Sequence, residues 1–569
     1  MHMVGATGLT GGTPLASELR EGGIVEELRL ELAVHNPQRA PALMDLLLYD
    51  KCRQEPNLTL LLNTTVDGAE TTGNRVRAVT ATRAATEERF RITAVSFVDC
   101  TGDGRLGAEA GVAYRQGREG RNEFAEKLAV AQADTKTLGS TILLQARKHE
   151  RPMPFVAPLW VRRFQKSDFR LRPFGRPGFD LGLEYGYWWA EWGGCLDTLK
   201  DNERIRDELL AITLGVWNHI KNESDLAPTA AHWALEWIGF LPGKRESRRF
   251  VGRHVLCEAD LFQSHPQPDA IAYGGWPVDL HPPEGVDAPR KEPCDQHHLP
   301  HLYDIPLRAC LAREFDNLLF AGRNLSATHV AFASTRVMAT CGVIGQGVGT
   351  AVALALRAGV APAEVPARPE LLQAIQQRLL RDDCYLIGRT NCDEADLVRR
   401  AAFCRASSAQ SGAEAELVRS GQTRTVQGTG EGISAPPDRA NPGLHRWMSE
   451  PEAGLPAWLE VRWTQSVSLG AVELTFDTGL HRLLTLSQAD GYTAKMQWGR
   501  PQPETVRDYR IEAEVLGSWV VLETITDNYQ RRRVHAVIPA GSVDALRIVV
   551  TATNGLDHAR LCELRCYAP

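Results

Sequence analysis

The sequence predicts a Rossmann-like α/β domain with a large α+β insertion, followed by an all-β sandwich. Two segments predict the α/β domain, because each runs from an apolar strand through a glycine turn into a helix: SFVDCTGDGRLGAEAG, and NLLFAGRN with the later VMATCGVIGQGVGTAVALAL. The tryptophan-rich block between them indicates one inserted domain. After Trp458, alternating stretches such as WLEVRW and ALRIVV are separated by turn residues and show no long helical pattern, which is typical of a sandwich.

Composition sets the broad class of protein. The 569 residues are 43% apolar and 24% charged, with a net charge of −6, so folded globular domains are expected and a nucleic-acid partner is not. The longest apolar stretches are shorter than the ~20 residues that cross a bilayer, so no membrane partner is expected either. The N-terminal MHMVGATGLTGG has no signal-peptide pattern and no CxxC pair occurs, which favours a cytoplasmic location unless a missing N-terminus carries an export signal.

Local patterns predict the individual elements and the domain boundaries. A helix is expected over 42–54, a strand over 58–66, a β-meander that ends at Cys100, and a helix over 202–221. The resulting boundaries are 1–112 and 301–365 for the α/β domain, 113–300 for the insertion, 366–400 for a helical linker and 401–569 for the sandwich.

The TGDG turn contains a literal G-x-G-x-x-G in Gly102, Gly104 and Gly107. A strand precedes it and a helix follows, as in a dinucleotide fingerprint. However, the strand is the last of a meander, and no acidic residue ends a second strand ~20 residues later. A purely structural turn is therefore a competing interpretation.

Two longer stretches, FVDCTGDGRLGAEAGVAYRQG and YDIPLRACLAREFDNLLFAGRNLSATHVAFASTRVMATCGVIGQGVGTAVALA, resemble the bacterial FAD-dependent oxidoreductase family. This family belongs to the glutathione-reductase superfamily and is distantly similar to fumarate-reductase flavoproteins. The resemblance covers Met1 to about Ala401. The remainder, through WLEVRWTQSVSLGAVELTFD and ALRIVVTATNG, resembles a discoidin-type, galactose-binding-like jelly roll.

The resemblance implies FAD as the cofactor and places its contacts. The two turns would approach the phosphate-ribitol chain, the helix after Arg336 would direct its N-terminus at the isoalloxazine, and Val66 would meet the adenine. A helix N-terminus suits the negative charge of reduced flavin. The implied cofactor residues are Val66, Thr101, Gly102, Asp103, Gly104, Gly322, Arg323, Asn324, Met338 and Gly342. The small residues of that helix have a second interpretation, which is tight helix packing.

The sequence departs from the family at its start. The family opens with a strand and a G-x-G-x-x-G turn, whereas Gly5, Gly8, Gly11 and Gly12 follow no strand and do not fit that spacing. The FAD-binding domain is therefore expected to be N-terminally truncated, without the helix N-terminus that binds the pyrophosphate.

Catalytic and substrate-binding candidates follow from their positions beside these motifs. His329 is a candidate base and Arg336 is a cation at the expected start of a helix, where it opposes the dipole unless an anionic ligand or a salt bridge offsets it. Arg245 and Arg248 belong to the cationic run GKRESRR, which either binds an anionic substrate or is ion-paired. His298 and His301 are candidates for the substrate pocket. Cys294, His297, His298 and His301 match no standard zinc spacing, so no metal site is predicted.

These features predict an FAD-dependent oxidoreductase that moves a hydride between flavin and a small organic substrate, at an alcohol or sugar carbon. The alternative is a non-catalytic carbohydrate-binding or scaffold protein on a degenerate flavin fold, and a weaker one is a metal enzyme. The sandwich is expected either to bind a glycan at its loop tips or to pack against the catalytic domain. The sequence does not indicate an oligomeric state.

Overall fold

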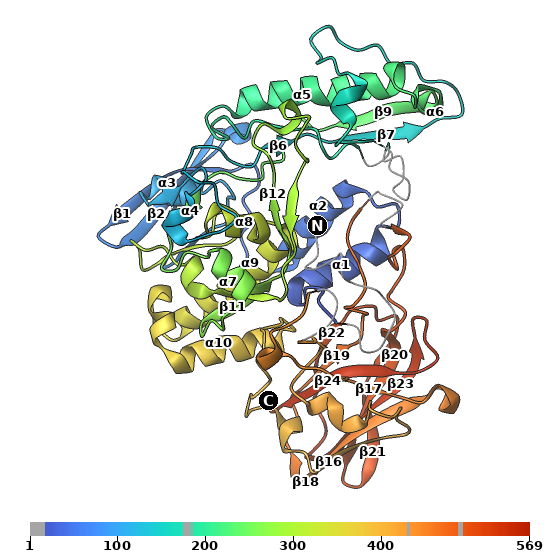
Figure 1. Cartoon of the computed structure of the whole chain (residues 1–569). Coiled ribbons are helices and arrows are strands. Elements are labelled where there is room, and N and C mark those ends of the chain that lie inside the picture. The colour runs from blue at the N-terminus through green and yellow to red at the C-terminus, as the bar shows by residue number, and fades with distance from the viewer. Residues whose placement is uncertain (1–16, 175–182, 184–185, 429–432, 488–492) are drawn as a thin grey trace.

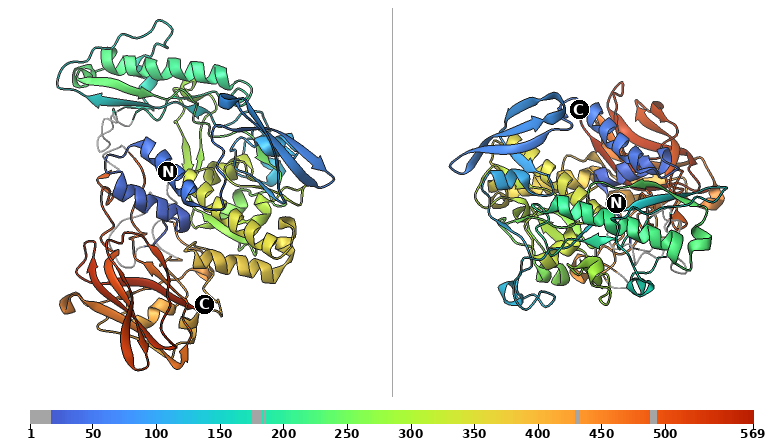
Figure 2. Two further views of the ribbon diagram at one scale, coloured as in Figure 1. Left: turned by 180° about the vertical axis from the view of Figure 1, so that it is seen from behind. Right: turned by 90° about the horizontal axis from the view of Figure 1, so that it is seen from above.

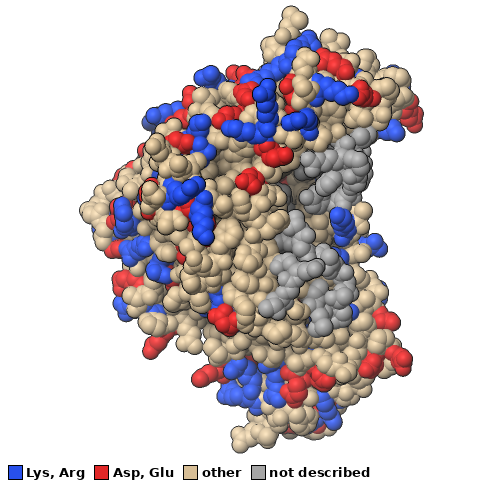
Figure 3. All heavy atoms as spheres, in the orientation of Figure 1, with Lys and Arg blue, Asp and Glu red and all other residues tan. Residues whose placement is uncertain are grey.

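The computed structural model describes residues 17–174, 183, 186–428, 433–487 and 493–569. The inserted domain and the C-terminal sandwich lie at opposite ends of the molecule, with the α/β domain between them (Figures 1 and 2). On the face shown in Figure 3, acidic and basic side chains are mixed over both ends and are sparse over the middle.

The α/β domain is built on one parallel strand pair. β4 (Phe97–Asp99) pairs with β15 (Leu318–Phe320) in the register Val98 to Leu319. The long helix α9 (Met338–Arg357) packs against β11 (Ala270–Gly274), α10 (Pro369–Arg381) and α1 (Gly23–His35). Among the described helices, α9 alone is long and apolar enough to cross a membrane, but buried core helices share these properties. The other elements are α2 (Pro41–Gln54), α3 (Arg105–Glu109), α4 (Arg121–Phe124), α7 (Glu258–Gln263), α8 (His329–Thr335), β5 (Tyr114–Arg115), β10 (Arg249–Phe250), β12 (Val278–Leu280), β13 (Asp295–His297) and β14 (Tyr303–Pro306).

The predicted meander is confirmed only as far as Thr93, because its expected last strand, β4, pairs with β15 instead. The strand expected before the meander is not confirmed. β1 (Thr65–Thr72), β2 (Arg75–Arg83) and β3 (Glu88–Thr93) form an antiparallel sheet. The strand expected over 58–66 is wrong for most of its length, since β1 begins at Thr65. Leu58, Leu60 and Leu62 are 45%, 36% and 52% exposed, because no described strand pairs with this segment. The preceding helix α2 confirms the predicted helix but buries none of its residues.

The inserted domain lies under a long amphipathic helix, α5 (Asn202–Asn218). The helix predicted over 202–221 is confirmed, although its last turn widens into a π-helical turn at His219–Glu223. Its buried face, which includes Ile205, Leu209 and Trp217, packs on a small sheet core. The other elements are β6 (Ser140–Thr141), β7 (Leu144–Lys148), β8 (Glu191–Trp192), α6 (Ala227–Ala230) and β9 (Trp233–Ile238).

The predicted all-β sandwich is confirmed. Its two sheets have the strand orders β16-β18-β23-β20-β21 and β17-β24-β19-β22, and their inner faces share one apolar core around Trp447, Leu474 and Ile511. The strands are β16 (Phe403–Ala406), β17 (Trp447–Met448), β18 (Ala457–Val467), β19 (Ala471–Phe476), β20 (Val506–Val515), β21 (Ser518–Ile525), β22 (Arg532–Ala536), β23 (Val543–Thr553) and β24 (Arg560–Tyr567). The helical linker is only partly helical, because α10 ends at Arg381 and Asp383 takes a left-handed conformation with φ of 58°.

Buried ion pairs join the sandwich to the N-terminal part of the described chain. Arg20 is paired with Glu26 at 2.5 Å and donates to the carbonyl oxygens of Thr478, Gly479 and Arg482. Glu18 is paired with Arg446 at 2.7 Å. Since the side chains of all these ionised groups are at most 4% exposed, the sandwich is an integral part of the fold.

Candidate active site

The two glycine turns lie side by side, and Asp99 holds them together. Asn324 Nδ2 donates to the carbonyl oxygen and to Oδ1 of Asp99, both at 3.1 Å. The Asp99 carboxylate also accepts from the backbone N–H groups of Thr101 at 2.9 Å and Gly107 at 2.8 Å. One buried carboxylate at the end of β4 therefore fixes the turn after β4 and the turn after β15.

Asp103 links the first turn to the second and to the cationic loop. Its carboxylate is paired with Arg323 and with Lys244, both at 2.6 Å, and accepts from Ser247 Oγ at 2.9 Å. Burial opposes ionisation of Asp103, but the charges and hydrogen bonds of Arg323 and Lys244 outweigh it and lower the pKa of this carboxyl. The predicted cofactor residues Asp103 and Arg323 thus contact each other.

The glycines of the literal G-x-G-x-x-G make room for an aromatic ring. A Cβ at Gly104 or Gly107 would come within 2.8 Å or 2.2 Å of the Phe250 ring. Phe250 stacks on Phe320 of β15 with ring centroids 4.3 Å apart. Tight packing therefore explains these two glycines, which favours the structural interpretation of the motif.

Arg336 does not start a helix, which corrects the sequence prediction. It is the C-cap of α8, so the cation lies at the favourable negative end of that helix dipole. It is paired with Asp279 at 3.1 Å, so the salt bridge is the explanation that the structure shows. α9 begins two residues later at Met338, whose side chain is 63% exposed. A Cβ at Gly342 would lie 2.8 Å from Val25, so this glycine lets α1 approach α9.

A buried chain of charges extends from Arg336 into the inserted domain. His281 Nε2 lies 2.9 Å from Asp279 and Nδ1 lies 2.9 Å from Glu191, so each ring nitrogen faces a carboxylate. Glu191 is in turn 3.2 Å from Arg245. Burial opposes ionisation of Asp279, but His281 and Arg336 outweigh it and hold its pKa far below the usual range. Arg245 is therefore ion-paired rather than free.

His329 is the first residue of α8, and acidic side chains hold its ring and its backbone. Its Nδ1 lies 2.9 Å from a carboxylate oxygen of Glu246, and its backbone N–H donates to Glu119 at 2.7 Å. Both carboxylates are paired with the fully buried Arg249. Because Nδ1 faces a carboxylate, we assign the proton of the neutral ring to Nδ1, which leaves Nε2 as an acceptor. Nε2 has no hydrogen-bond partner among the described residues.

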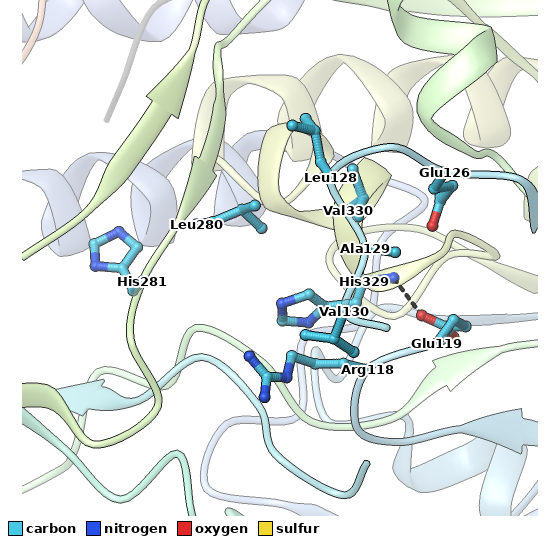
Figure 4. A pocket seen from close by; sticks show the side chains of 10 residues that line it. All are labelled: Arg118, Glu119, Glu126, Leu128, Ala129, Val130, Leu280, His281, His329 and Val330. Atoms are coloured by element: carbon cyan, nitrogen blue, oxygen red, sulfur yellow. Dashed lines mark hydrogen bonds between the residues drawn. The ribbon is translucent and has the colours of Figure 1, made fainter. Parts of the chain in front are cut away.

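A small cavity of ≈ 50 Å³ lies beside His329. Figure 4 shows His281 on one side of it, Glu119 and Glu126 on the other, and His329 between them. The lining residues are Arg118, Glu119, Glu126, Leu128, Ala129, Val130, Leu280, His281, His329 and Val330. The sequence identified only His329 of this set, because most of the other residues come from the stretch 118–130, which no motif marks.

The cavity wall has two acidic residues, Glu119 and Glu126, and Glu126 is the one whose carboxylate is less fully hydrogen-bonded. Its Oε1 accepts from Thr328 Oγ1 at 2.5 Å and from the backbone N–H of Glu258 at 2.9 Å, while Oε2 is buried with no hydrogen-bond partner among the residues that the structure describes. Burial raises the pKa of this carboxyl, and the nearby Glu119 and Glu258 raise it further. An acceptor of this kind at a cavity is suited to binding a hydrogen-bond donor or to moving a proton.

The remaining candidates lie elsewhere. His298 is exposed, and His301 bonds Ser434 Oγ at 3.1 Å, so the structure does not place either one in this cavity wall. Arg248 donates to the Asp103 carbonyl oxygen at 3.2 Å and lies over the Tyr114 ring. Val66 packs in the core beneath the meander. Among the described residues, no group of three or more His, Cys, Asp or Glu side chains could hold a metal ion.

The family model of FAD dependent oxidoreductases matches residues 7–379. The chain belongs to this family. The predicted family is therefore confirmed, and FAD is the cofactor that the family uses. No curated protein matches the chain of this FAD-dependent oxidoreductase.

Solved carbohydrate-binding modules have low-scoring similarity to this FAD-dependent oxidoreductase. The family 32 module of C. perfringens NanJ in complex with galactose is 12% identical, with 30% of this chain and 98% of the module covered and a TM-score of 0.21. A chitosan-binding module from Paenibacillus sp. IK-5 is 17% identical, with 30% and 98% covered and a TM-score of 0.20. The family 32 module of Streptococcus pneumoniae EndoD is 12% identical, with 30% and 94% covered and a TM-score of 0.21. At these TM-scores the likenesses support no argument about this oxidoreductase.

The described residues of the oxidoreductase fit part of an FAD site. The two turns expose a glycine backbone at Gly322, where a Cβ would meet little, and a Cβ at Gly345 of α9 would meet nothing within 4 Å. The edge of β4 away from β15 is unpaired among the described strands, and apolar side chains of α2 and of 58–62 are exposed. These residues provide open backbone and apolar surface, but no second strand–turn–helix for a pyrophosphate.

Proposed function

We propose that this oxidoreductase oxidises a small organic molecule, at a carbon that bears oxygen, in the cavity beside His329. The observation that carries this proposal is the His329–Glu246 pair, because the carboxylate orients the ring and leaves Nε2 as a base at the cavity. His329 also opens the helix that follows the Ala321–Asn324 turn, so the base and a family motif belong to one segment. The sugar or alcohol nature of the substrate is part of the proposal.

The same proposal assigns the residues that hold FAD. When bound, FAD supplies the acceptor for a hydride. The backbone of Thr101 and Gly102 and that of Gly322 and Asn324 would line its ribitol side, while the Asp103–Arg323 ion pair joins the two turns. The start of α9 at Met338 would face the ring system, and Val66 would lie toward the adenine.

The edge of β4 that no described strand pairs also belongs to the proposed flavin site. Parallel sheets are normally covered on both faces, and a parallel pair of three-residue strands with one open edge is unusual. The exposed Leu46, Leu48 and Tyr49 of α2, with Leu58 to Leu62, form an apolar face beside it.

The absorption spectrum of the purified chain, before and after titration with FAD, tests the proposal. We expect flavin bands in the visible range and their bleaching when an oxidisable alcohol or sugar is added without oxygen. His329→Gln should keep the flavin spectrum and lose the bleaching. A chain that neither copurifies with FAD nor binds added FAD would contradict the proposal.

The alternative function is a non-catalytic scaffold on a degenerate flavin fold. The observation that favours it is the ion pair of Asp103 with Arg323 and Lys244, which fills space between the two turns with side chains. A colourless chain that binds glycans through its sandwich would support this alternative.

A further inference from the structure

The described residues that line the cavity beside His329 offer hydrogen-bond acceptors but no free cation. Two of the residues that line it carry such an acceptor: His329 Nε2 and Glu126 Oε2 have no hydrogen-bond partner in the described part of the chain. Both belong to side chains that are at least nine-tenths buried, since His329 is 6% and Glu126 is 2% exposed. Two acceptors left open at one cavity are costly unless a ligand or water donates to them.

The cations at the cavity already have carboxylate partners. Arg118 donates through Nε and Nη2 to the two oxygens of Asp134. His281 lies between Glu191 and Asp279, each at 2.9 Å. A bound carboxylate or phosphate would therefore meet Glu119 and Glu126 without an unpaired cation among the described lining residues, so electrostatics disfavour an anionic ligand.

The rest of the wall is apolar and the space is small. Leu128, Ala129, Val130, Leu280 and Val330 complete the lining. The volume of ≈ 50 Å³ holds a few water-sized groups, since one water needs about 10–15 Å³ by the same measure. A cavity of this size suits a carbon that bears a hydroxyl, one neighbouring carbon and an apolar group beside them.

We propose that this cavity binds the carbinol end of a neutral alcohol or polyol, with His329 as the base and Glu126 as the acceptor of a second hydroxyl. The hydroxyl O–H bond breaks and its proton passes to His329 Nε2, while Glu246 stabilises the imidazolium. When bound, FAD would accept the hydrogen of the carbinol carbon as a hydride, with both electrons, and the C–O bond would become a carbonyl. Only the fate of the hydride rests on the proposed function; the choice of ligand rests on the cavity.

Ligand-observed NMR with propane-1,2-diol and lactate, without flavin, tests the ligand class. The two molecules have similar size and share a hydroxyl, but only lactate carries a charge. We expect saturation transfer to the diol and little to lactate. His329→Gln should weaken diol binding by about fivefold or more, the loss of one net hydrogen bond.

Glu126→Gln provides a test that does not depend on loss of binding. The amide keeps the Oε1 contacts with Thr328 and Glu258, removes the negative charge and adds a donor, so lactate binding should increase by about fivefold relative to the diol. Glu123→Gln is the matched control, because Glu123 is an exposed carboxylate of the same segment that pairs with Arg115, and it should change neither ligand.

Lactate binding as tight as diol binding in the unmodified chain, or an unchanged preference in Glu126→Gln, would overturn the inference. A colourless chain that still prefers the diol would overturn the proposed flavin chemistry and leave the ligand assignment standing. The two failures are therefore distinguishable.

Discussion

The C-terminal sandwich and the α/β domain differ in how fully their sheets are paired and their apolar side chains are buried. The sandwich has a five-stranded and a four-stranded sheet that bury one apolar core between them. The α/β domain has a parallel pair of three-residue strands, a free edge on β4, and leucines at 58, 60 and 62 that are each at least 36% exposed. Among the described residues, the sandwich therefore has a closed core, whereas the α/β domain has an unpaired strand edge and exposed leucines.

The two regions also differ in how completely their buried carboxylates are paired. At the junction with the sandwich, Glu26 and Asp477 are each paired with arginines. At the cavity, Glu126 keeps one oxygen without a partner. Full pairing is what a permanent interface requires, while an open acceptor costs stability and is expected where a ligand binds.

The largest expected effect comes from breaking the junction of the sandwich with the N-terminal segment. Glu26→Ala removes the carboxylate partner of Arg20 and leaves a buried guanidinium, which should lower the free energy of unfolding by about 3–5 kcal/mol. Lys51→Ala is the control, because its pair with Glu27 is exposed and contributes about 1 kcal/mol at most. Urea denaturation of both variants measures the difference. Equal, small effects would mean that the sandwich is only loosely attached.

Matched leucine deletions compare the two cores directly. Leu474→Ala in the sandwich should cost about 2–5 kcal/mol, because Leu474 is fully buried in β19. Leu60→Ala should change stability by less than about 0.5 kcal/mol in the chain alone, because its side chain is 36% exposed. A large cost at Leu60 would show that this face is covered in solution.

The sequence was most informative where elements are long and periodic. It predicted the sandwich, α5 and α2, because alternation and helical spacing depend on local residues. It was wrong over 58–66, because an apolar alternation becomes a strand only when another strand pairs with it. At the site it identified His329 but missed Glu126 and His281, since ion pairs across distant segments leave no local pattern. It placed Arg336 at a helix start because it did not separate α8 from α9.

Glycine substitutions sharpen the interpretation of the literal fingerprint. Gly107→Ala should cost about 1–3 kcal/mol by overpacking, because its Cβ would lie 2.2 Å from the Phe250 ring. Gly345→Ala, on α9 with open space around it, should stabilise the chain by about 0.5–1 kcal/mol in thermal unfolding. If Gly107→Ala instead left stability unchanged and weakened FAD binding, the turn would be a phosphate site after all.

The smallest expected effect is a difference in pH dependence between the two buried carboxyls. Burial opposes ionisation of Glu26, but Arg20 outweighs it and lowers the pKa, so its stabilisation is present above the ordinary value of 4.5 and is lost as the pH falls through the folded value. Burial raises the pKa of Glu126, so its contribution is present below 4.5 and is lost as the pH rises through the raised value. Glu126→Gln cannot ionise, and it should therefore gain stability relative to the unmodified chain as the pH rises above 4.5, whereas Glu26→Gln should lose most at neutral pH. Urea midpoints of both variants across this pH range measure the two slopes. Slopes of the same sign would mean that Glu126 has found a cationic partner, and the contrast between a closed junction and an open site would fail.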